Sequence, residues 1–179
     1  MAEPASILFV CTANICRSPW AQLRAQTLMP HLRFESAGTL ATPGNRMDPV
    51  MAATLPVESR PTADVAPRGS RPISYLEAQD HDLILTMDRG HRAFLAEEFP
   101  EAIRKTFTLG QFVQTTQSAP PGLALPELVR WAYRHRVRPS RETDVADPFG
   151  RGREAAERCA VQLEQLLGAL RTVLPGEER

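Results

Sequence analysis

A short segment near the N-terminus combines two thiols, an arginine and two hydroxyl groups. It runs Cys11-Thr12-Ala13-Asn14-Ile15-Cys16-Arg17-Ser18. Cysteine thiolates are strong nucleophiles, and the planar guanidinium of an arginine can bind two oxygens of a phosphate group. A thiol and an arginine in one short loop therefore indicate cleavage of a phosphate ester.

The residues on either side of this segment predict how it is positioned. The four apolar residues 7–10 predict a strand that is buried on both faces of a parallel sheet, and Pro19 favours the start of a helix. The N-terminus of that helix and the N–H groups of the loop would bind an anion and favour the thiolate form of Cys11. Ser18 then has two candidate roles, as the N-cap of the helix or as a partner of the departing thiolate.

A metal site and simple packing are two alternative roles for the loop cysteines. Structural zinc normally has four ligands, and neither Cys159 nor the four histidines show ligand spacing, so we predict no metal site. Buried cysteines without a chemical role are common. Arg17 in the same loop favours the catalytic interpretation, and Cys159 is expected to pack in the core.

Residues 10–19 resemble the signature of the low-molecular-weight protein tyrosine phosphatases of the bacterial type. Three later segments resemble further landmarks of that family in the same order: 35–39, 82–88 and 144–150. The resemblance implies one domain over residues 1–179. It also implies an α/β fold, a three-layer αβα sandwich with a four-stranded, parallel, doubly wound sheet, in which a phosphate-binding loop (residues 11–18, the phosphate loop) follows the first strand.

The same resemblance implies a mechanism. Cys11 would be the nucleophile that forms a phosphocysteine, Arg17 would bind the phosphoryl oxygens, and Asp147 in residues 144–150 (the acid loop) would be the general acid and base. Protonation of a leaving group by a carboxylic acid typically contributes ~10²–10⁴-fold to the rate. Taken alone, Asp-Pro-Phe-Gly would suggest only a turn. No cofactor is implied.

Further roles follow from the resemblance alone. Asn14, Ser18 and Ser36 would brace the phosphate loop, and Cys16 would be the redox partner of Cys11 in a reversible disulfide. The implied phosphate- and substrate-binding residues are Thr12, Ala13, Asn14, Ile15, Cys16, Ser18 and Phe149.

The chain departs from the family pattern in its substrate-facing residues and in one supporting residue. Arg68 stands where many members have a supporting histidine, no aromatic residue lies between Ala37 and Val50, and Phe149 is followed by Gly150 rather than a second aromatic residue. Ile15 resembles the tyrosine-selective members, because phosphoarginine phosphatases tend to have Thr there.

The implied partner is a phosphotyrosine protein, with a tyrosine kinase among the candidates, and the chain would be a monomer or a weak dimer. Three alternatives stay open: an arsenate reductase on the same fold, a phosphoarginine phosphatase and a non-catalytic phosphate-binding module. A reductase that relays electrons through its own thiols is disfavoured, because no cysteine lies between Cys16 and Cys159.

Composition limits the other functional classes. The chain has 179 residues, 42% of them hydrophobic, with 21 basic and 21 acidic residues that balance to zero net charge. This balance gives no general attraction to nucleic acid, and no apolar run is long enough to span a membrane. Since the N-terminus also lacks a secretory signal pattern, we expect a cytoplasmic protein, where a catalytic thiol stays reduced.

Hydrophobic periodicity alternates strands and helices along the chain. The predicted strands are 6–10, 32–36, 82–87 and 104–109, and the predicted helices are 19–29, 49–55, 89–98, 123–136 and 151–174. Residues 56–72 suggest an irregular connection. Residues 113–143 look like an insertion that contains five arginines. A solvated helix face is the simpler interpretation of these arginines, and the sharper hypothesis is that they border the catalytic cleft.

Overall fold

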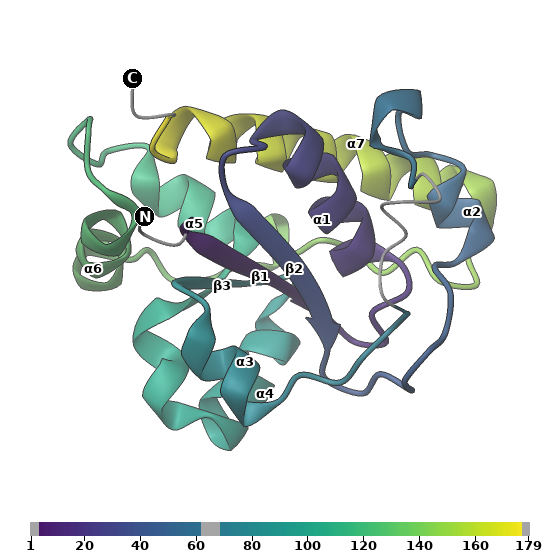
Figure 1. Cartoon of the computed structure of the whole chain (residues 1–179), viewed down its shortest axis with the longest axis horizontal. Helices are drawn as coiled ribbons and strands as arrows, with labels where there is room; N and C mark the ends of the chain where they lie inside the picture. The colour runs from purple at the N-terminus through teal and green to yellow at the C-terminus, as the bar shows by residue number, and fades with distance from the viewer. Residues whose placement is uncertain (1–3, 62–68, 177–179) are drawn as a thin grey trace.

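Four parallel strands form the centre of the protein, in the order β2-β1-β3-β4 (Figure 1). The computed structural model describes residues 4–61 and 69–176. The strands are β1 (Ser6–Cys11), β2 (Arg33–Gly38), β3 (Leu83–Thr86) and β4 (Thr106–Thr108). In the register of β1, Cys11 lies beside Gly38 and Val10 beside Thr86. The first strand therefore ends next to the carboxyl ends of both its neighbours.

Helices cover both faces of this sheet. Figure 1 shows α1 and α7 on one face and α3 and α4 on the other. The helices are α1 (Arg17–Leu28), α2 (Pro49–Ala52), α3 (Tyr75–Asp80), α4 (Arg89–Glu98), α5 (Leu109–Thr116), α6 (Leu125–His135) and α7 (Gly152–Val173). Within the two described ranges, no helix is long and apolar enough to cross a membrane.

Strand β1 is completely buried because its side chains pack alternately into two hydrophobic clusters, one on each face of the sheet. Ile7 and Phe9 belong to the larger cluster with α1 and α7, whereas Leu8 and Val10 pack with residues of α3 and α4. A strand with apolar residues at every position needs a covered face on each side. The three-layer arrangement therefore explains why the apolar run before the phosphate loop is unbroken.

The predicted fold class is confirmed, and all four predicted strands and all five predicted helices are present. The helix predicted over 89–98 has the same bounds as α4, and the ends of the other elements are shifted. The helix predicted over 49–55 is only four residues long. Helices α3 and α5 were not predicted. Each begins with a capping box, Ser74 with Glu77 and Thr108 with Gln111, and this sequence signal could have identified them. Strand β4 ends at Thr108 because the apolar residues that follow it belong to α5.

Candidate active site

The phosphate loop follows the carboxyl end of β1, and two of its carbonyl groups accept hydrogen bonds from residues outside the loop. The carbonyl of Thr12 accepts a hydrogen bond from the N–H of Leu40 at 2.9 Å, and that of Ile15 accepts one from Asp48 at 2.8 Å. In the described parts of the chain, the backbone N–H groups of residues 13–16 have no protein acceptor. The loop therefore presents several N–H donors to an anion.

Ser18 interacts directly with the thiol of Cys11. Its Oγ lies 3.0 Å from Cys11 Sγ, and both residues are buried. The N-cap role considered for Ser18 is wrong, because α1 begins at Arg17 and Cys16 occupies the N-cap position. The hydroxyl also lies 3.3 Å from the carbonyl oxygen of Ala37, to which it can donate, and the shorter contact allows it to donate instead to a thiolate on Cys11.

Asn14 ties the phosphate loop to β2. Its φ of 55° is in the left-handed region, which Asn tolerates better than most residues. The Nδ2 group donates to Ser18 Oγ at 3.0 Å and to Ser36 Oγ at 2.9 Å, while Oδ1 accepts from the N–H of Arg71 at 3.1 Å. The structure thus brings the three residues of the expected brace together.

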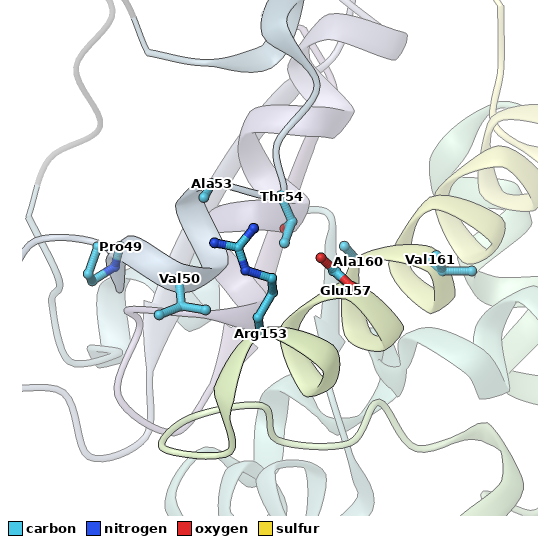
Figure 2. Close-up of a pocket in the computed structure, with 8 residues that line it drawn as sticks. All are labelled: Pro49, Val50, Ala53, Thr54, Arg153, Glu157, Ala160 and Val161. Atoms are coloured by element: carbon cyan, nitrogen blue, oxygen red, sulfur yellow. The ribbon is translucent and has the colours of Figure 1, made fainter.

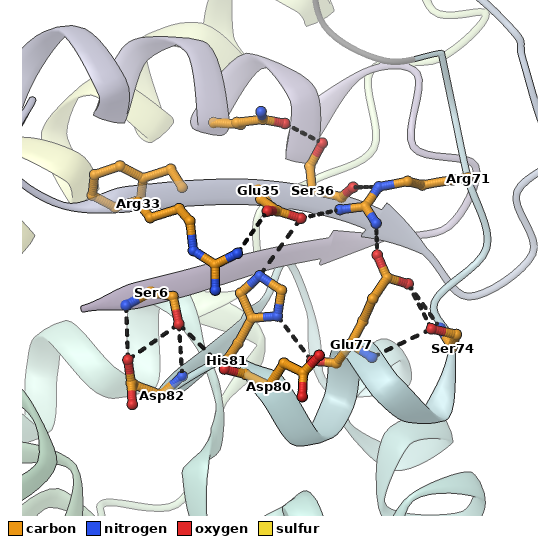
Figure 3. Close-up of polar contacts among 12 residues, drawn as sticks. Ser6, Arg33, Glu35, Ser36, Arg71, Ser74, Glu77, Asp80, His81 and Asp82 are labelled. Atoms are coloured by element: carbon orange, nitrogen blue, oxygen red, sulfur yellow. Dashed lines mark hydrogen bonds and ion pairs between the residues drawn. The ribbon is translucent and has the colours of Figure 1, made fainter. Parts of the chain in front are cut away.

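Arg71 extends this brace and was not predicted. Figure 3 shows its guanidinium between β2 and α3, where Nε donates to the carbonyl of Ser36 and the terminal nitrogens pair with Glu35 and Glu77. Its backbone N–H is the group that holds Asn14. Arg68, the residue at the position of the family's histidine, lies outside the described residues. The brace therefore includes an arginine whose backbone and side chain hold different parts of it.

Gly38 allows β2 to approach the phosphate loop. A Cβ at this position would lie 2.9 Å from the backbone nitrogen of Asn14 and closer still to the carbonyl oxygen of Thr12. We expect Gly38→Ala to lower the free energy of unfolding by about 1–3 kcal/mol, because rigid backbone must move. Urea denaturation measures this change. Gly168→Ala, in an open position of α7, is the matched control and should be neutral or stabilising. Equal effects at the two positions would contradict the steric explanation.

Arg17 is buried and held from several sides. Its Nη1 donates to Asp88 Oδ2 at 3.1 Å and to the carbonyl of Val145 at 3.0 Å, and its Nη2 donates to Asp147 Oδ2 at 2.9 Å. Its buried Nε has no acceptor among the described side chains and backbone. A buried guanidinium whose plane is fixed by these contacts and whose Nε–H has no acceptor is suited to binding a tetrahedral anion.

Asp147 lies at the mouth of the phosphate loop. It reaches Arg17 from 130 positions along the chain, and its side chain is 45% exposed. The carboxylate also accepts the N–H of Phe149 at 3.1 Å, and Phe149 itself is exposed. A carboxyl group in this position can exchange protons with a leaving group or with water.

Asp88 and His91 belong to the site although neither was singled out as a site residue. Asp88 follows β3 at the carboxyl edge of the sheet, caps α4 and pairs with Arg17. Burial opposes the ionisation of Asp88, but His91 and Arg17 outweigh it and hold the pKa of this carboxyl well below its usual range. His91 Nε2 lies 2.8 Å from Thr12 Oγ1. The signal was available, because ligands bind beyond the carboxyl ends of parallel strands.

Cys16 and Cys159 are neutral thiols. Burial raises the pKa of each to about 12, with the charges of Asp48 and Cys11 adding to the effect at Cys16. Both are free and buried, and Cys159 packs in the larger core cluster as expected. Neither thiol is therefore a competing nucleophile near neutral pH.

Two of the cavities among the described residues lie outside the phosphate loop. One, of about 560 Å³, is lined by residues of α2 and α7 and the adjoining Ala53 and Thr54, as Figure 2 shows, and it includes none of Cys11, Arg17 or Asp147. The other, of about 750 Å³, contains Arg130 and Arg134 of α6.

The second cavity corrects the hypothesis about the arginine-rich segment for two of its five arginines. Arg130 and Arg134 line it together with His81 and Lys105, which lie just before β3 and β4. In a parallel sheet this is the edge opposite the phosphate loop. These two arginines therefore do not border the catalytic cleft, and both are exposed, as the simpler interpretation predicts.

Fold and site together define a class of protein: an α/β sandwich with a cysteine in an anion-binding loop at the carboxyl edge of its sheet. Residues 6–127 match the family model described as low molecular weight phosphotyrosine protein phosphatase. The chain belongs to this family of hydrolases.

Two relatives illustrate its range. The chain is 32% identical to a protein-arginine-phosphatase of Geobacillus stearothermophilus, over 98% of this chain and 99% of the relative. It is 30% identical to the low molecular weight protein-tyrosine-phosphatase Wzb of Escherichia coli K12, over 92% and 96%. The solved structure of the YwlE arginine phosphatase from G. stearothermophilus superposes with a TM-score of 0.71, covering 94% of this chain and 92% of that one.

Proposed function

We propose that this protein hydrolyses phosphotyrosine in proteins through a phosphocysteine intermediate. The Cys11 thiolate attacks phosphorus, so that an S–P bond forms while the bond to the tyrosine oxygen breaks. Asp147 donates a proton to that oxygen. The Asp147 carboxylate then takes a proton from water, whose oxygen attacks phosphorus, releases inorganic phosphate and restores the thiolate.

One observation carries this proposal: a buried thiol, a buried guanidinium and an exposed carboxylate converge on one loop of free N–H donors. Arg17 and the loop amides stabilise the charge of the phosphoryl group as it transfers. Ser18, 3.0 Å from the sulfur, stabilises the thiolate as attacking and as leaving group. A module that only binds phosphate needs neither the thiol nor the carboxylate, which argues against the non-catalytic alternative.

A panel of substrates tests the proposal. Matched peptides carrying phosphotyrosine, phosphoserine or phosphoarginine are assayed for phosphate release, with arsenate reduction measured in parallel. We expect the highest kcat/KM for phosphotyrosine. A preference for phosphoarginine, or turnover of arsenate alone, would overturn it. An autophosphorylated tyrosine kinase is one candidate substrate, and the reducing cytoplasm is the compartment that we propose for a catalytic thiol.

Phosphoarginine hydrolysis is the second candidate, because relatives matching nearly the whole chain are named protein-arginine-phosphatases. Ile15 distinguishes the two. Its apolar side chain, half-buried in the phosphate loop, offers no acceptor to the N–H groups of a phosphoarginine.

We expect Ile15→Thr to raise the kcat/KM ratio of phosphoarginine over phosphotyrosine by about tenfold, because the new hydroxyl accepts a hydrogen bond. Steady-state kinetics on the matched peptides measure the ratio. Ile15→Val keeps the branched shape without a hydroxyl and serves as the control. A similar change in both variants would mean that side-chain volume, not hydrogen bonding, sets the preference.

A further inference from the structure

His91 takes part in a closed ring of polar contacts around Arg17. Its Nε2 is 2.8 Å from Thr12 Oγ1, and its Nδ1 is 3.0 Å from Asp88 Oδ1. The other oxygen of Asp88 pairs with Arg17 Nη1 at 3.1 Å, and Arg17 Nη2 approaches Thr12 Oγ1 at 3.4 Å. The ring therefore connects an imidazole to the guanidinium that binds the phosphoryl group in the proposed function.

The ring determines which way the Thr12 hydroxyl points. Asp88 is a carboxylate near neutral pH. Its Oδ1 lies 3.0 Å from His91 Nδ1 without the angle of a hydrogen bond, and its negative charge favours a proton on that nitrogen. In the neutral imidazole, Nε2 is then an acceptor, and the Thr12 hydroxyl donates to it. In the imidazolium, Nε2 is a donor, and Thr12 Oγ1 becomes the acceptor. The hydroxyl proton of Thr12 must then turn to another acceptor.

An oxygen of a phosphoryl group bound at the loop would be an acceptor for this proton. Thr12 is half-exposed in the phosphate loop, and its Oγ1 lies beside the same Arg17 nitrogen that contacts Asp147. We propose that His91 is a positioning residue whose protonation turns the Thr12 hydroxyl toward the bound phosphoryl group and tightens anion binding at the loop. The role rests on the proposed phosphatase function, because it acts on the same anion site.

Among the described residues, the charged groups near His91 lie on the loop side and on α4 itself, where the neighbouring Arg92 donates to the carbonyl of Thr106. Asp88, with Arg17 and Asp147 beyond it, lies on the loop side, and the Arg89–Asp144 pair lies at the start of α4. Strands β3 and β4 carry no charged residue. The 3₁₀ segment Pro100–Lys105 also packs on α4, but its charged residues Glu101, Arg104 and Lys105 line the cavity at the opposite edge of the sheet.

Sulfate binding tests this coupling of His91 protonation to the Thr12 hydroxyl, which we call the relay, without depending on catalysis. Sulfate keeps its charge between pH 5.5 and 8, and the Cys11→Ser background removes the titration of the nucleophile. An imidazole changes charge between about pH 5 and 8, so we expect calorimetry to show about tenfold tighter sulfate binding at the acidic end. His91→Gln in this background should abolish most of the pH dependence, while Asp147 remains in every variant.

Variants of Thr12 distinguish the relay from simple electrostatic attraction between the imidazolium and sulfate. We expect Thr12→Val to lose most of the pH dependence although His91 is intact, and Thr12→Ser to restore it. Because linkage is reciprocal, sulfate should also move the imidazole titration of His91, followed by ¹⁵N NMR, to higher pH with Thr or Ser at position 12 but not with Val. Full pH dependence in Thr12→Val, or none in the Cys11→Ser parent, would overturn the relay. Failure of the phosphatase proposal would appear separately, as no turnover of phosphotyrosine by the unmodified protein.

Discussion

Replacing Cys11 with Ser is expected to abolish turnover, with a loss of at least about 10⁴-fold in kcat for a phosphotyrosine peptide. Serine puts a neutral hydroxyl in place of the thiolate that Ser18 and the loop N–H groups stabilise, and a neutral hydroxyl is a much weaker nucleophile. Binding should persist, since Arg17 and the backbone of the loop are unchanged. Steady-state kinetics together with calorimetry of a non-hydrolysable phosphonate peptide separate the two quantities.

Cys159→Ala provides the matched control, because it removes a buried thiol from α7 rather than from the phosphate loop. We expect it to retain kcat and to lose some stability through the small cavity that it leaves. Iodoacetate gives an independent check. It should label Cys11 before Cys16 or Cys159, because burial keeps those two thiols protonated. Appreciable phosphotyrosine turnover by Cys11→Ser would show that the mechanism is wrong.

Asp147→Asn should lower kcat/KM by ~10²–10⁴-fold for phosphotyrosine, because an amide cannot protonate the leaving oxygen. The loss should depend on the leaving group. We expect it to be largest for phenyl phosphate, whose phenolate is a poor leaving group, and much smaller for p-nitrophenyl phosphate, whose phenolate needs little protonation to depart. The kcat/KM values of both esters, measured for both proteins, give this comparison, because kcat/KM reports the step in which the leaving group departs.

Glu142→Gln is the control for charge in the same segment. Glu142 is exposed and precedes the acid loop, so neutralising it should leave kcat unchanged for both esters. Asp147→Asn also removes a partner of Arg17, which by itself would change kcat/KM for both esters alike. A loss of kcat/KM that is equal for the two esters would therefore indicate a role in loop positioning and contradict general acid catalysis.

The position of the phosphate loop between a buried strand and a helix could be predicted because these parts are contiguous. A buried strand, a short loop and a helix N-terminus follow one another over residues 6–28, and each has a local sequence signal. Even within this segment the role of Ser18 needed the structure. Residue type allowed two roles, and only the position where α1 begins decided between them.

The partners of the loop depend on the order of the strands. Asp88, His91 and Asp147 reach the loop from 71 to 130 positions away, because parallel crossovers bring the strand ends to one edge of the sheet. Nothing in local periodicity marks them as neighbours. The family resemblance suggested Asp147, and the segment that holds Asp88 and His91 follows a predicted strand at the same edge. Their contacts with Arg17 and Thr12, and the contacts of Arg71, required coordinates.

Sequence alone was sufficient for the reaction type and the class of fold, since both depend on short-range patterns: apolar runs buried on two faces, and a nucleophile adjoining an anion site. The tertiary structure decided how the site is completed and which surfaces surround it. It connected His91 to Arg17 through Asp88 and carried Arg130 and Arg134 to the opposite edge of the sheet. Such contacts arise from the packing of segments distant in sequence, so their energies are not encoded in any local pattern.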